Sequence, residues 1–101
     1  MDIEKLIPAV MARRGEQVAD PEYLHNVRLA CEEAMAHLRK IAGNPDLDFS
    51  DPDDRTLLID CAWYVLERQR AEFDREYSGD LIILRLREAH GCGKEESADL
   101  P

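Results

Sequence analysis

The chain has 101 residues, of which 22 are Asp or Glu and 13 are Lys or Arg, giving a formal net charge of -9. This length supports one domain with a single modest core and excludes most multistep enzymes. The negative charge would on average repel nucleic acid and anionic membranes, which makes both unexpected as ligands.

The first predicted element is a helix near the N-terminus. Its apolar stripe begins at Ile3 and ends at Met11, with Asp2 as a possible cap and Gly15 as its end. Pro8 lies inside this pattern, and it would either kink the helix or make it begin late.

The second predicted helix covers residues 21–42 and has clear signals at both ends. Asp20 is suited to the N-cap, Pro21 fits the first helical position, and Gly43 follows the last turn. Apolar residues recur at steps of three and four along about six turns, which predicts one buried stripe: Leu24, Val27, Cys31, Ala34, Met35, Leu38 and Ile41.

The third predicted helix follows a Pro- and Asp-rich connection over residues 43–50. The sequence Ser50-Asp51-Pro52-Asp53-Asp54 combines a cap, a proline and carboxylates that favour the positive end of the helix dipole. Residues 57–66 are mostly apolar on more than one face, so we expect this helix to form the centre of the core.

The last predicted helical segment begins after Arg70 and has a narrow apolar seam of Phe73, Tyr77, Leu81 and Leu84. Ser78-Gly79 interrupts the segment, which leaves open whether it is one helix with a weak point or two consecutive helices. We expect an all-α bundle of about four helices, with residues 1–90 as one domain and 91–101 as a flexible, polar C-terminal tail.

The sequence contains few signals of its cellular compartment. No apolar run reaches the roughly 18 residues that span a bilayer, and the first residues do not resemble a signal peptide, so we expect a cytoplasmic protein. The three cysteines, Cys31, Cys61 and Cys92, are an odd number without a CxxC pair, which argues against a disulfide framework.

Residue patterns for catalysis or metal binding are weak. Glu33 and His37 are four residues apart, but the chain lacks the paired Glu-x-x-His motifs of a di-iron bundle. His90 and Cys92 have no second ligand pair, and the Asp46–Asp54 cluster lacks the glycine and glutamate of an EF-hand loop. We therefore predict no enzymatic activity, no catalytic residues, no cofactor and no metal site.

The arginines and aromatic residues of the C-terminal half admit a partner-binding interpretation. The arginines alternate with acids, which favours solvated ion pairs over a nucleic-acid surface: Arg68, Arg70, Arg75, Arg85 and Arg87. The four large rings favour the core at their spacing, although one or two of them could face a partner: Trp63, Tyr64, Phe73 and Tyr77.

The stretch from Asp51 to Arg87 resembles a known family. Its acidic helix start, the run Cys61-Ala62-Trp63-Tyr64-Val65-Leu66, the segment Ala71-Glu72-Phe73-Asp74 with Tyr77, and Asp80-Leu81-Ile82-Ile83-Leu84-Arg85 carry the resemblance. They are similar to the small head-tail connector proteins, also called adaptor or head-completion proteins, of tailed bacteriophages and prophages. The preceding short helix, long helix and Pro-containing loop agree in layout.

This resemblance implies a structural virion protein at the neck, the head-tail junction, present in the host cytoplasm during assembly. It would form a homo-oligomeric ring of about a dozen copies that binds the portal and a neck or tail-completion protein while DNA passes without specific binding. Residues after the last helix would dock on the portal. The interface prediction combines the last apolar seam with these residues: Phe73, Tyr77, Leu81, Leu84, Gly91, Cys92, Gly93 and Lys94.

A second hypothesis comes from the net charge alone. A small acidic helical module could bind and sequester a basic partner, and it would then have a regulatory function instead of a structural one. Recovery of virion proteins or of a basic host factor from a lysate would distinguish the two hypotheses.

Overall fold

A computed structural model of the chain describes residues 3–13 and 20–92, while residues 1–2, 14–19 and 93–101 lie outside its described part. Those described ranges contain no strand and five helices: α1 (Ile3–Arg13), α2 (Pro21–Ala42), α3 (Pro52–Leu66), α4 (Arg70–Glu76) and α5 (Ser78–Cys92). The expected all-α fold is confirmed, with five helices in place of about four.

The ends of α2 and α3 form as their sequences predict. The Asp20 carboxylate accepts a hydrogen bond from the Glu22 amide at 3.0 Å, and the Asp51 carboxylate accepts one from the Asp53 amide at 2.8 Å. Gly43 ends α2 with φ at 73°, a left-handed conformation that favours glycine. α1 contains Pro8, so it does not begin late.

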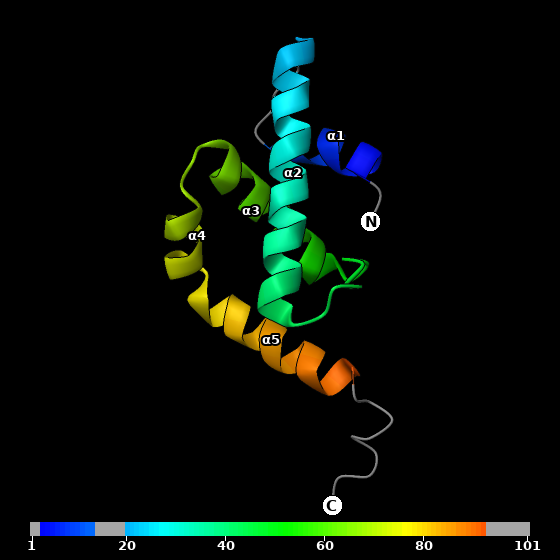
Figure 1. The fold of residues 1–101 in the computed structure, drawn as a ribbon, viewed down its shortest axis with the longest axis vertical. Coiled ribbons are helices and arrows are strands. Elements are labelled where there is room, and N and C mark those ends of the chain that lie inside the picture. Colours follow the sequence, from blue (N-terminus) through cyan, green and yellow to red (C-terminus); the bar gives the residue numbers. More distant parts are fainter. Residues whose placement is uncertain (1–2, 14–19, 93–101) are drawn as a thin grey trace, which may run out of the picture.

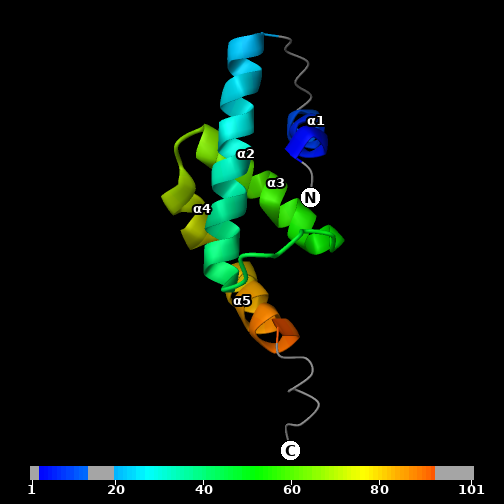
Figure 2. The ribbon, with the colours of Figure 1, turned by 45° about the vertical axis from the view of Figure 1, so that its right-hand side comes forward.

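The long helix α2 is the centre of the arrangement. Figures 1 and 2 show α1 and α3 packed against it, while α5 crosses below its C-terminal end. α4 lies on the flank of α2 opposite the 43–51 connection. This arrangement leaves one side of α5 facing away from the other helices.

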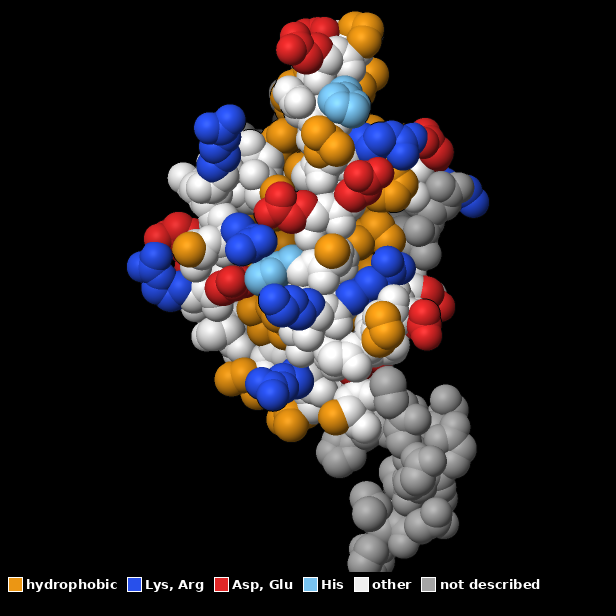
Figure 3. All heavy atoms as spheres, viewed as in Figure 1, with side chains coloured by type: hydrophobic (Ala, Val, Ile, Leu, Met, Phe, Trp, Pro, Cys, Tyr) orange, Lys and Arg blue, Asp and Glu red, His pale blue; other side chains and the backbone are white. Residues whose placement is uncertain are grey.

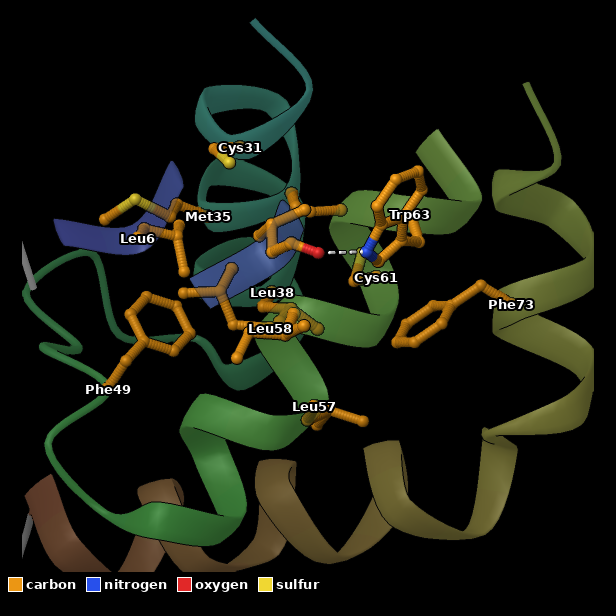
Figure 4. Packing of buried hydrophobic residues seen from close by; sticks show 14 of the residues in the cluster. Leu6, Cys31, Met35, Leu38, Phe49, Leu57, Leu58, Cys61, Trp63 and Phe73 are labelled. Carbon is orange, nitrogen blue, oxygen red and sulfur yellow. Dashed lines mark hydrogen bonds between the residues drawn. The ribbon is translucent and has the colours of Figure 1, made fainter. Parts of the chain in front are cut away.

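The core lies between α1, α2 and α3, as Figure 4 shows. Leu38, Leu58 and Cys61 are fully buried, and the Trp63 indole N–H donates to the Val10 carbonyl at 2.6 Å. Because α3 contacts α1, α2 and α4, its apolar residues are covered on several sides, as its sequence predicts.

The last helical segment consists of two helices, which settles the alternative left open by Ser78-Gly79. Tyr77 separates α4 from α5, and its carbonyl accepts the Leu81 amide while its own amide donates to the Phe73 carbonyl. The Phe73 and Tyr77 rings stack with their centroids 4.6 Å apart, and Tyr64 meets both rings edge-on. α5 continues through Gly91 to Cys92.

Candidate interaction surface

The apolar seam that the sequence assigns to a partner interface lies mostly in the core. Phe73, Leu81 and Leu84 have exposed fractions of 0%, 7% and 2%, so a partner cannot reach them without separating the helices. Tyr77 is half-buried, and its hydroxyl donates to Asp60 Oδ2 at 3.0 Å. The core interpretation of this seam therefore holds, and any partner contact on α5 must involve other side chains.

The opposite side of α5 carries three large apolar side chains. Ile82, Ile83 and Leu86 have exposed fractions of 59%, 62% and 56%, and their spacing places them on one side of a helix. We call these three residues the α5 outer face. The sequence contained a signal for it, because the run Leu81-Ile82-Ile83-Leu84 with Leu86 is too wide for a single seam.

Polar contacts hold α5 in place and so fix the direction of its outer face. Arg87 Nη2 donates to both carboxylate oxygens of Asp54 on α3, at 2.6 and 2.7 Å. The Asn44 side chain donates to Glu88 Oε1 at 2.9 Å. The hydrogen bond from Arg87 to Asp54 raises the pKa of the Arg87 guanidinium, which therefore stays charged.

A cationic groove adjoins α5. It has a volume of about 630 Å³ between α2, α4 and α5, and it contains the side chains of Lys40, Arg70 and Arg85 beside His37 and Glu33. Arg70 pairs with Glu33 at 3.2 Å, and His37 Nε2 lies 2.7 Å from Asp74 Oδ1. Figure 3 shows blue Lys and Arg side chains on this face, with red Asp and Glu side chains between them.

The acidic loop, defined as residues 44–53 and thus including the first two residues of α3, lies on the other flank of α2 (Figures 1 and 2). It contains four exposed carboxylates: Asp46, Asp48, Asp51 and Asp53. Leu47 and Phe49 are buried and hold the loop to the body, and Arg39 Nε donates to the Leu47 carbonyl at 2.9 Å. The backbone hydrogen bond from Ser50 is the main cause of a lowered pKa at Asp48.

The residues considered for metal chemistry have other contacts. Glu33 and His37 bond to two different α4 residues, Arg70 and Asp74, which makes them part of the α2–α4 packing. No group of three potential metal-ligating side chains occurs among the residues that the structure describes. Within the same residues, no helix is long and apolar enough to cross a membrane.

The two core cysteines are poor nucleophiles. Burial is the main cause that raises the pKa of Cys31 to about 11 and that of Cys61 to about 12. Both thiols are therefore neutral at physiological pH and act as small apolar side chains. Cys92 contributes backbone to α5 with Gly91, whereas Gly93 and Lys94 lie outside the described residues.

Comparisons with known proteins find no relative of this chain. The chain matches no protein-family model, no curated protein and no solved structure. Its function must therefore be inferred from the α5 outer face, the cationic groove and the acidic loop.

Proposed function

We propose that the protein is a structural subunit of a phage or prophage head-tail connector, forming a ring below the portal and joining the capsid to the neck or tail. The observation that carries this proposal is the α5 outer face, where three large apolar side chains are more than half exposed. A soluble monomer seldom leaves such residues side by side on one helix, whereas a subunit surrounded by neighbours can cover them.

The charge distribution supports this structural function. A connector surrounds DNA without holding it, and a chain with a net charge of -9 would repel the phosphate backbone on average. Two of the basic side chains in the cationic groove, His37 and Arg70, already bond to carboxylates. This groove is therefore better suited to an acidic protein surface than to a nucleic-acid track.

Electron microscopy of the purified protein, with and without the portal protein encoded in the same genome, tests the proposal. We expect rings, and we expect the Ile82→Ser/Ile83→Ser variant to remain monomeric because its outer face is polar. Leu29→Ser is the matched control, since Leu29 is 48% exposed on α2, outside this face. Native protein that neither forms rings nor binds the portal would refute the proposal.

A second candidate function has one observation in its favour. Asp60, Glu67, Glu72 and Glu76 line a groove of about 530 Å³ together with the Tyr64 ring. Such a groove suits a basic segment, which agrees with an acidic module that sequesters a basic protein. A salt-sensitive pull-down that recovers a basic host protein, and no portal or tail protein, would favour this function over the connector.

A further inference from the structure

We propose that the acidic loop of one subunit docks on the cationic groove and the adjoining α5 outer face of the next copy. This inference rests on the proposed ring and identifies its subunit contact. The occupant of the α5 outer face would thus be a second copy of this chain, with the contact repeating head to tail around the ring.

The receiving surface combines unpaired charge with apolar area. Among the described residues, neither Lys40 nor Arg85 forms an ion pair, although both side chains lie in one groove. Arg85 belongs to α5 and lies one residue before Leu86 and three after Ile82, so the groove continues into the outer face. A partner that covers this surface needs carboxylates beside apolar groups.

The acidic loop meets that requirement. Its four exposed carboxylates lie within eight consecutive positions, from Asp46 to Asp53, and none of them pairs with a cation in the described part of the chain. The fifth acid, Asp54, is buried and already bound to Arg87. Pro45 and Pro52 are exposed in the same segment and offer apolar surface. Charge complementarity therefore favours a second copy as the partner.

The positions of the two surfaces explain why the contact repeats. The cationic groove is formed by residues of α2, α4 and α5 near the C-terminal end of α2. The acidic loop follows that end, and Figures 1 and 2 show its backbone on the flank of α2 opposite α4. One subunit cannot satisfy both surfaces internally. A two-fold dimer would use both surfaces at once and would need them on the same face, whereas here they lie on opposite flanks. Copies placed side by side bring loop to groove at each step, and a constant rotation closes the series into a ring.

Two charge-reversed variants test the contact. The groove variant is Lys40→Glu/Arg85→Glu, and the loop variant is Asp46→Lys/Asp53→Lys; all four side chains are exposed, and neither helix cap is altered. Native mass spectrometry should show each variant alone as a monomer. Their mixture should recover an oligomer in which the two variants alternate, because the native loop of one meets the native groove of the other and the reversed loop meets the reversed groove.

The controls separate folding, net charge and the contact. Lys5→Glu/Arg75→Glu changes the net charge as the groove variant does, at exposed positions outside the groove, and should keep the oligomer. The four-substitution variant that reverses both surfaces should recover the oligomer. Circular dichroism should show native helix content in every variant, and any variant that unfolds is replaced by the milder Lys40→Gln/Arg85→Gln or Asp46→Asn/Asp53→Asn pair.

Each outcome bears on a separate claim. If the wild type and both variants form rings, this docking contact is wrong while the connector proposal stands. If each variant alone is monomeric and the mixture yields no oligomer, the head-to-tail pairing is wrong. If the wild type neither assembles nor binds a portal, the connector proposal fails together with this contact.

Discussion

The ion pair between Asp54 and Arg87 provides the sharpest test of how α5 is held. Asp54 is the one charged residue that is buried among those the structure describes, with its side chain 7% exposed. Replacing Arg87 by Met leaves this carboxylate without its two hydrogen bonds of 2.6 and 2.7 Å. The free energy of unfolding should therefore fall, and α5 should lose its polar connection to α3.

The magnitude follows from the burial of the two partners. Removing one partner of a fully buried pair costs about 3–5 kcal/mol, but the Arg87 side chain is 41% exposed, so solvent screens part of this interaction. Asp54 also lies in the first turn of α3, where the helix dipole stabilises its charge. We therefore expect Arg87→Met to cost about 2 kcal/mol.

A double-mutant cycle separates the pair from its surroundings. The variant Asp54→Asn/Arg87→Met should cost about 1 kcal/mol, less than Arg87→Met alone, because it no longer leaves a charge unpaired. Urea unfolding followed by the fluorescence of Trp63, the single tryptophan, measures each value. The Ile82→Ser/Ile83→Ser background keeps unfolding separate from dissociation. A cost below about 0.5 kcal/mol for Arg87→Met, or a double variant less stable than this single one, would show that the ion pair does not hold α5 in place.

Three further predictions concern other parts of the fold. Leu84→Ala should lower the free energy of unfolding by about 2–4 kcal/mol, whereas Ile83→Ser should change it by less than about 1 kcal/mol. The reason is that the Leu84 side chain is 2% exposed and that of Ile83 is 62% exposed. Equal costs in urea unfolding would contradict a buried side and an exposed side of α5. Gly43→Ala should cost about 1 kcal/mol through backbone strain alone, since a Cβ there meets no atom within 4 Å, and a neutral result in thermal unfolding would contradict it. Above pH 9 the thiols of the unfolded chain ionise, while Cys61 in the folded protein stays protonated because its pKa is raised to about 12. The free energy of unfolding should therefore fall by about 1.4 kcal/mol per pH unit for this group. The Cys61→Ala variant should show a shallower decline, and parallel declines would disprove the raised pKa of Cys61.

Much of the fold could be predicted from the sequence because its signals are local. Asp20, Pro21 and Gly43 satisfy or end the backbone hydrogen bonds of α2 through near neighbours, so their effect does not depend on the rest of the chain. The burial of the α2 stripe from Val27 to Leu38 and the central position of α3 follow from helical spacing, whereas Leu24 and Ile41 at the ends of that stripe are half-buried. These elements needed no tertiary information.

The remaining features depend on contacts between distant segments. Phe49 is buried with φ at 59°, in a loop whose composition indicates only a solvated connection, because the ring packs beside Arg39 of α2. Likewise, the sequence cannot show which side of α5 faces the body. The connection of Arg87 to Asp54 and that of Glu88 to Asn44 settle this direction, so the predicted seam entered the core and the outer face was missed.

The proposed connector subunit forms a ring and completes its surface with neighbouring copies. Negative-stain electron microscopy of the wild-type protein mixed with its portal tests that claim most directly, with the Ile82→Ser/Ile83→Ser variant imaged beside it. We expect closed rings on the portal for the wild type, and bare portals with dispersed monomers for the variant. Bare portals and dispersed monomers for the wild type as well would contradict it.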